Sequence, residues 1–155
     1  MNFALIDKSG LGYSTFEVFA SASTYSSIIQ KYIAVGYGTN SIAYSTNGTQ
    51  WNGLGNTIFT LIGNNVDHNG KINIAVGSGL NSIAYSYNGI SWVGLGTTVF
   101  SDAGYGICWD GTKFVAGGKG YYNIGYSMDG KSWTQVTTTL PLNSYVRNIT
   151  SNVGV

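Results

Sequence analysis

Charged residues are scarce in this sequence. Lys, Arg, Asp and Glu make up 8% of the 155 residues, where about 25% is usual. The seven cations and six anions give a net charge of +1, and the cations are spread along the chain. A nucleic-acid-binding protein gathers Lys and Arg on one face. The sequence therefore predicts no nucleic-acid partner.

Cysteine, histidine and proline each occur once. With Cys108 as the only cysteine and His68 as the only histidine, we expect no intrachain disulfide, no His-rich metal site and no Cys–His nucleophile pair. Cys108 lies in an apolar run and is expected to be a buried thiol. His68 falls at a strand position. The sequence predicts no metal and no cofactor.

Long apolar runs are also missing. The apolar run at the N-terminus is too short for a signal peptide and lacks a basic region. No segment reaches the roughly 20 apolar residues of a membrane span. Residues that favour long helices are scarce, whereas Gly (23 residues) and Tyr (12) are abundant. This composition predicts an all-β chain without a membrane span, and it favours an extracellular or virion-surface location.

A repeat of 41 residues runs through the sequence. Three segments align without gaps, and their tryptophans Trp51, Trp92 and Trp133 are 41 residues apart. Apolar segments upstream of them keep the same register. A fixed period of about 40 residues is typical of repeat architectures such as propellers. The aligned segments are 41–51, 82–92 and 123–133, preceded by 33–36, 74–77 and 115–118.

Each repeat is predicted to form four short strands. In the third copy these are residues 106–109, 113–117 and 123–127, with a fourth strand around Trp133. Asp-Gly pairs at 110–111 and 129–130 predict turns, because both residues tolerate positive φ. The other copies carry Asn-Gly at 47–48, 69–70 and 88–89.

Side-chain size alternates along the predicted strands. Ile74 and Val76 point to one face, whereas Ala75 and Gly77 point to the other. Such a sheet packs well when the large face of one copy meets the small face of the next. The predicted fold is therefore all-β: a β-propeller, or part of one, of four-stranded blades with a 41-residue repeat.

The repeat count leaves the closure of the propeller open. We expect a single domain over residues 1–155, with strand equivalents also at 2–6, 13–19, 144–149 and 152–155, which amounts to just under four blades. The chain could close a four-bladed ring, exchange ends with a second chain, grow into a filament, or be a fragment of a longer propeller. The first three possibilities predict self-association or pairing through terminal strands. The predicted parts are a partial blade at 1–24, repeats at about 25–65, 66–106 and 107–147, and a terminal partial blade at 144–155.

The segments 44–51, 85–92 and 126–133 resemble the Asp-box, or BNR, repeat of sialidase-like propellers. The units are also similar to repeats in phage and large-virus surface proteins. The resemblance implies a hairpin between the third and fourth strands, with an acidic side chain that ties down the turn and an aromatic residue between blades. Two copies carry Asn in place of Asp, and the Ser-to-Trp spacing is one residue shorter than in the common box. The implied roles pass to Asn47, Asn88 and Asp129, and to Trp51, Trp92 and Trp133.

The residues needed for glycoside hydrolysis are largely absent. A sialidase, by the same resemblance, clamps its substrate with three arginines, but Arg147 is the only arginine and Glu17 the only glutamate here. Other glycosidases need a carboxylate pair at a set separation, and Asp67 with Asp102 is the pair left open. The sequence predicts a non-catalytic structural or surface-binding module, self-assembling, of an adhesin or surface type. The alternatives are a multivalent carbohydrate-binding lectin and a glycosidase relative that lacks catalytic residues.

Ligand contacts are expected where the copies differ, because shared positions are explained by folding. The loops between second and third strands and between blades are predicted to open on one face. Tyrosine rings stack on pyranose faces and amides bind hydroxyl groups, so a glycan is one ligand that these residues would suit. The alternative for the tyrosines is that they are ordinary residues of a β surface. Asn40 and Asn81 could instead only complete turns. The candidate residues are Tyr37, Asn40, Asn81, Lys119, Tyr121 and Tyr122.

Overall fold

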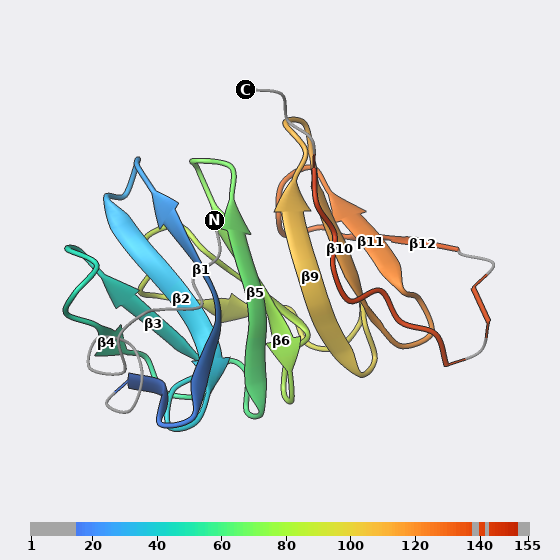
Figure 1. Ribbon diagram of the computed structural model, residues 1–155. Helices are drawn as coiled ribbons and strands as arrows, with labels where there is room; N and C mark the ends of the chain where they lie inside the picture. Colours follow the sequence, from blue (N-terminus) through green and yellow to red (C-terminus); the bar gives the residue numbers. More distant parts are fainter. Residues whose placement is uncertain (1–14, 138–139, 142, 152–155) are drawn as a thin grey trace.

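A computed structural model describes residues 15–137, 140–141 and 143–151 (Figure 1). All twelve elements in these residues are β-strands, which confirms the all-β prediction. Hydrogen bonds join them into one open antiparallel sheet rather than a closed barrel. In the same residues, no helix is long and apolar enough to cross a membrane. The strands are β1 (Phe19–Ser26), β2 (Lys31–Tyr37), β3 (Ile42–Ser45), β4 (Asn52–Gly53), β5 (Ile62–His68), β6 (Asn73–Ser78), β7 (Ile83–Ser86), β8 (Val93–Gly94), β9 (Ala103–Trp109), β10 (Phe114–Lys119), β11 (Ile124–Ser127) and β12 (Thr134–Val136).

The sheet consists of three four-stranded meanders, which we call unit 1 (β1–β4), unit 2 (β5–β8) and unit 3 (β9–β12). Within each unit, consecutive strands pair antiparallel. Neighbouring units are joined by single residue pairs, Tyr37 with Ile62 and Ser78 with Ala103. The units lie side by side with their first two strands in front (Figure 1).

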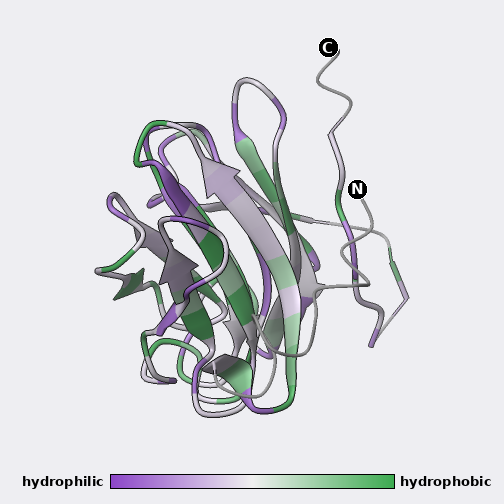
Figure 2. Cartoon of the chain, turned by 60° about the vertical axis from the view of Figure 1, so that its left-hand side comes forward, coloured by the Kyte–Doolittle hydropathy of each residue, from purple (hydrophilic) through white to green (hydrophobic). Residues whose placement is uncertain are grey.

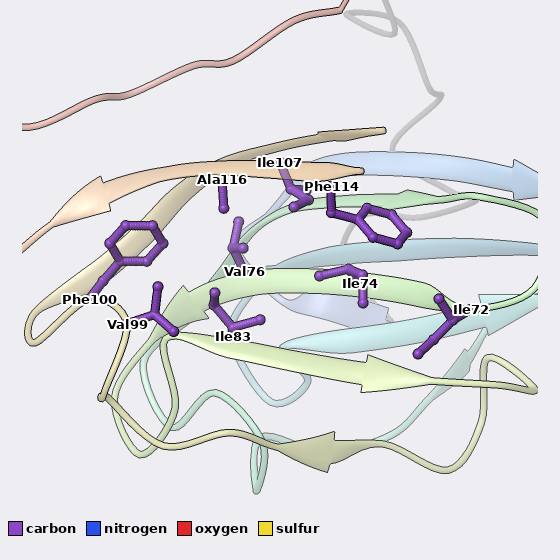
Figure 3. Packing of buried hydrophobic residues seen from close by; sticks show 9 residues of the cluster. All are labelled: Ile72, Ile74, Val76, Ile83, Val99, Phe100, Ile107, Phe114 and Ala116. Carbon is purple, nitrogen blue, oxygen red and sulfur yellow. The ribbon is translucent and has the colours of Figure 1, made fainter. Parts of the chain in front are cut away.

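The units pack face to face, and the predicted contact of large with small side chains is found between units 1 and 2, whereas units 2 and 3 also place large side chains against each other. Ile33 and Val35 of unit 1 share a buried cluster with Ala75 and Ala84 of unit 2. The opposite face of unit 2 contributes Ile74 and Val76 to a second cluster, where they meet Ile107, Phe114 and Ala116 of unit 3 (Figure 3). Along several strands, hydrophobic residues alternate with neutral or hydrophilic ones (Figure 2).

The predicted Asn-Gly and Asp-Gly pairs lie in turns. Their glycines have positive φ values between 75° and 97°, a region that only glycine adopts freely. The Asp110 Oδ1 atom accepts hydrogen bonds from the backbone N–H groups of Thr112 and Lys113, at 2.9 and 2.8 Å. The turn at Asp110 is therefore fixed by its own side chain.

The units begin earlier in the sequence than the predicted repeats. The boundaries expected at residues 25, 66 and 107 each fall inside a first strand, β1, β5 or β9. Each first strand contains a β-bulge, which leaves Ser21, Asn64 and Tyr105 without a partner in the ladder. A bulge inserts an extra residue and reverses the alternation. The sequence pattern upstream of the bulges was therefore not recognisable as strand.

The predicted terminal strands have mixed outcomes. Residues 2–6 and 152–155 lie outside the described part of the chain. The strand expected at 13–19 is wrong for residues 15–18, because the first strand in the described part of the chain begins at Phe19 and continues to Ser26. Residues 144–149 run along unit 3 and make one isolated bridge, between Tyr145 and Lys119.

Candidate functional site

The side chain at the predicted box position ties down its own turn in all three units. The Asn47 Oδ1 atom accepts from the backbone N–H groups of Thr49 and Gln50, at 3.0 and 2.9 Å. Asn88 and Asp129 accept from residues at the same offsets, at 2.7–2.9 Å. An amide oxygen and a carboxylate oxygen are both acceptors. The exchange of Asp for Asn therefore leaves the turn unchanged.

Serine and tryptophan complete these turns. Ser45 Oγ accepts from the Gly48 N–H group at 2.9 Å, and Trp51 Nε1 donates to the Gly48 carbonyl at 3.2 Å. Units 2 and 3 repeat both hydrogen bonds. Trp92 packs on the cluster between units 1 and 2, and Trp133 on the cluster between units 2 and 3. The turns thus couple local geometry to packing between units.

Asp129 should make stability depend on pH in the acid range. The N–H groups of Ser132 and Lys131 lower the pKa of its carboxyl from 3.8 to about 2. Since the native pKa is depressed, the stabilisation is complete above about pH 4 and is lost as the pH falls towards 2. In the wild type, the free energy of unfolding should therefore fall by an amount on the order of 1 kcal/mol between pH 4 and pH 2, after allowance for solvent screening. Asp129→Asn should remove this pH-dependent loss. Denaturant unfolding at several pH values measures it.

The chain provides a matched control for this experiment at Asn88. Asn88→Asp places a carboxylate on two N–H groups in the same geometry, so this variant should gain the acid sensitivity that Asp129→Asn loses. Equal pH profiles for the wild type and Asp129→Asn between pH 2 and 4 would contradict the assignment.

The turns held by Asn47, Asn88 and Asp129 are called the box turns below. The loops between second and third strands meet the connectors between units at the end of each unit opposite its box turn. In unit 2, the Leu80 N–H group donates to Thr60 Oγ1 at 3.1 Å. In unit 3, the Lys119 ammonium lies 2.7 Å from the Asp102 carboxylate. We refer to this end of each unit as its loop end.

Asn40 and Asn81, two of the predicted ligand residues, hold the loop end together. Their Oδ1 atoms accept from the N–H groups of Gly55 and Gly96, at 2.7 and 2.8 Å. The Asn81 Nδ2 atom also donates to the Ile58 carbonyl at 2.7 Å. Both amides therefore serve the fold, which is the alternative that the sequence left open for them.

The other four predicted residues are distributed over two units. Tyr37 ends β2 in unit 1, where its ring lies 5.9 Å from that of Phe19. Lys119, Tyr121 and Tyr122 lie together at the loop end of unit 3. Tyr121 is 93% exposed, so its ring is free to meet a ligand. The structure thus brings three of the six residues together and separates Tyr37 from them.

A pocket of about 440 Å³ opens at the loop end of unit 3. This volume lies within the range of small-molecule sites, about 300–1,000 Å³. Three stretches of chain surround it: the loop after β10, the connector before β9 and the chain after β12. The lining residues are Ser101, Asp102, Lys119, Gly120, Tyr121, Asn123, Leu140, Pro141 and Asn143.

Asp102 and the residues after β12 were not among the predicted ligand residues. The repeat carries a signal that could have identified Asp102, because unit 2 has Leu61 at the same position. Lys119 likewise replaces Ser78. Leu140 and Asn143 lie 41 residues after Val99 and Asp102 in the predicted repeat, and only the structure brings them to the pocket.

The carboxylate pair that the sequence left open is excluded by position. Asp102 precedes the first residue of β9, whereas the Asp67 carboxylate accepts from the N–H group of Trp109, the last residue of β9, at 2.7 Å. A seven-residue strand spans roughly 20 Å, far more than the 5–9.5 Å, approximately, between glycosidase carboxylates. Asp67 and Asp102 therefore cannot act on one glycosidic bond.

His68 and Cys108 are packed strand residues, as predicted. The His68 Nδ1 atom accepts from the Gly70 N–H group and its Nε2 atom faces the Tyr25 carbonyl, both at 3.0 Å. Cys108 is buried, and burial raises the pKa of its thiol. Within the described ranges, no three His, Cys, Asp or Glu side chains form a group that could hold a metal ion.

Residues 145–151 follow unit 3 along the path that a first strand takes beside the preceding unit. Tyr145 pairs with Lys119, in the manner of Ile62 with Tyr37 and Ala103 with Ser78. Farther along, the Ser151 Oγ atom donates to the Trp109 carbonyl at 2.8 Å. The segment, coloured red, runs beside β9 and β10 (Figure 1). It therefore occupies the position that the first strand of a fourth unit would take.

Comparisons with known proteins give a likeness of fold. No family model matches the chain, and no curated protein matches it. Among solved structures it is similar to the crystal structure of the computationally designed Ika8 protein, with a TM-score of 0.51 and 12% sequence identity. The match covers 74% of this chain and 35% of that one. This chain thus spans about a third of the designed protein, and the likeness concerns the fold alone.

Proposed function

We propose that the chain is a non-catalytic structural module of the propeller type that associates with further copies of itself. In this proposal the three units are blades and their box turns are Asp boxes. The 41-residue period, the four antiparallel strands in each unit and the buried clusters between neighbouring units support the proposal. The module is non-catalytic because one arginine and one glutamate are available and Asp67 lies far from Asp102.

The observation that carries self-association is the edge of residues 145–151. In units 2 and 3, the first strand pairs with its neighbour over six residue pairs, β5 with β6 and β9 with β10. In the described residues, the segment 145–151 occupies the same position but forms a single bridge, to Lys119. An edge with unpaired N–H and C=O groups is a template for another strand. A strand from a second copy would satisfy it.

The three units form a stack, with unit 1 at one end and residues 145–151 at the other. Exposed aromatic rings on unit 1 also favour self-association. The Tyr25 and Tyr32 rings of unit 1 lie 4.6 Å apart and are 46% and 36% exposed. At the same positions of unit 3, Trp109 and Phe114 form a pair at 4.8 Å that packs against unit 2. The two ends of the stack differ, so contacts between copies would be head-to-tail.

Light scattering across a dilution series tests this function. The chain has a mass of 16.5 kDa, and we expect the measured mass to exceed this value and to rise with concentration. Asn148→Lys with Thr150→Lys should return it towards 16.5 kDa, because lysines on an open edge oppose further strand pairing. Both side chains are exposed, so the substitutions should leave the units intact.

The serine variant Asn148→Ser with Thr150→Ser is the matched control and should associate like the wild type. Two results would contradict the proposal. One is a wild-type mass that stays at the monomer value at every concentration. The other is association that the lysine variant leaves unchanged.

A further inference from the structure

The pocket at the loop end of unit 3 carries charged side chains where the same positions of unit 2 carry neutral ones. Unit 2 has the same backbone there: the Leu61 N–H group donates to the Ser78 carbonyl at 3.2 Å, and the Asp102 N–H group to the Lys119 carbonyl at 3.1 Å. The fold is thus satisfied by Leu61 and Ser78 as well as by Asp102 and Lys119. The charged pair of unit 3 is therefore not required for folding.

We propose that this pocket binds a neutral mono- or disaccharide. The proposal goes beyond self-association, which concerns the ends of the stack, and it does not depend on that function. It follows from the balance of charge in the pocket, from one exposed aromatic ring and from the mixture of polar and apolar walls.

The charges in the pocket cancel, which favours a neutral ligand. The Lys119 Nζ atom lies 2.7 Å from Asp102 Oδ2, and both side chains are about half exposed, at 41% and 54%. The pair offers carboxylate oxygens as acceptors and an ammonium group as donor on one wall. Sugar hydroxyl groups both donate and accept hydrogen bonds, so they can use both partners without burying an unpaired charge.

An apolar surface complements this polar wall. The Tyr121 ring is 93% exposed, and Leu140 and Pro141 contribute to the lining. A pyranose has a C–H face and a hydroxyl rim, and an aromatic ring packs on the former while polar groups bind the latter. Unit 2 has Leu80 where unit 3 has Tyr121, so the ring also distinguishes this loop from its neighbour.

Hydrogen bonds hold the sides of the pocket in place. The Asn123 Nδ2 atom donates to the Ser144 carbonyl at 2.7 Å, which joins the loop after β10 to the chain after β12. The Ser144 N–H group donates to the Pro141 carbonyl at 3.0 Å. A pocket held in this way loses little conformational entropy when a ligand binds.

Amide chemical shifts in an NMR titration would locate the binding. The probes are glucose, galactose, mannose, N-acetylglucosamine and lactose, with glucuronate and N-acetylneuraminate as charged comparisons. We expect at least one neutral sugar to give saturable shifts at Ser101, Asp102, Gly120 and Tyr121, with a Kd on the order of 1 mM. Tyr121→Leu, which installs the residue of unit 2, should weaken this binding by about two- to tenfold, because it removes the ring that packs on the sugar.

Leu80→Tyr in unit 2 is the matched control and should leave the Kd unchanged, because Leu61 and Ser78 provide no ion pair there. Saturable shifts confined to the loop end of unit 3 and weakened in Tyr121→Leu would support the proposal. Three results would overturn it: no saturable shift with any neutral sugar, equal binding by Tyr121→Leu, or binding of the charged sugars only. None of these outcomes bears on the light-scattering experiment.

Discussion

Replacement of Phe100 by alanine is expected to lower the free energy of unfolding by about 3–5 kcal/mol. The ring is completely buried in the cluster between units 2 and 3, beside Val76, Ile83 and Ala116 (Figure 3). Its removal leaves a cavity that the strands on both sides cannot close without breaking their ladders. Equilibrium unfolding in denaturant measures the loss.

Phe19 is the matched control for this prediction. It is also a phenylalanine, but it lies on the outer strand β1 and is 46% exposed. Phe19→Ala should cost well under half as much, because about half of the ring is already in contact with water. Equal costs at the two positions would mean that the cluster between units 2 and 3 is not the core of the fold.

Gly118→Ala is expected to be the second most damaging substitution, at about 1–3 kcal/mol. A Cβ atom on Gly118 would lie 2.5 Å from the Phe100 ring and would also press on the Ala103 carbonyl. The position needs glycine for this close approach rather than for an unusual φ, because Gly118 is not among the glycines with positive φ. The strand can accept the methyl group only if it moves away from the Phe100 ring and the Ala103 carbonyl. Thermal or denaturant unfolding measures the effect.

A double-mutant cycle separates the two parts of this clash. In the background of Phe100→Ala, the new methyl group of Gly118→Ala can occupy part of the cavity, so it should cost less than in the wild type. Strictly additive costs would indicate that the Ala103 carbonyl, and not the ring, is the obstacle. The same arrangement recurs at Gly77 with Phe59, where Gly77→Ala should behave alike.

The repeat and its local geometry were predictable from the sequence. A turn such as Asn69-Gly70 depends on residues close together in the chain, so its signal is complete in a few letters. The alternation of Ile74 and Ala75 fixes which side chains share a face, because the period of a strand is two residues. Together these features predicted the strands of each unit and the packing of large residues on small ones between units 1 and 2.

The tertiary structure decided what depends on contacts between distant parts of the chain. The starts of β1, β5 and β9 lie beyond bulges, where the alternation is reversed and only the partner strand shows that pairing continues. The position of residues 145–151 beside unit 3 likewise depends on contacts with β9 and β10.

The residues of the candidate site also fall into those that the sequence could indicate and those that only the tertiary structure brings together. Tyr121 and Lys119 could be chosen from the sequence because they break the repeat, and a break in a repeat is visible by comparison of the copies. Asp102 breaks the repeat as well, but only folding brings its connector, and Asn143 in the chain after β12, to the loop that carries Lys119 and Tyr121. The sequence alone determined the repeated unit, since its signals are local. The pocket and the open edge were decided by tertiary contacts, because no local pattern encodes which segments meet in space.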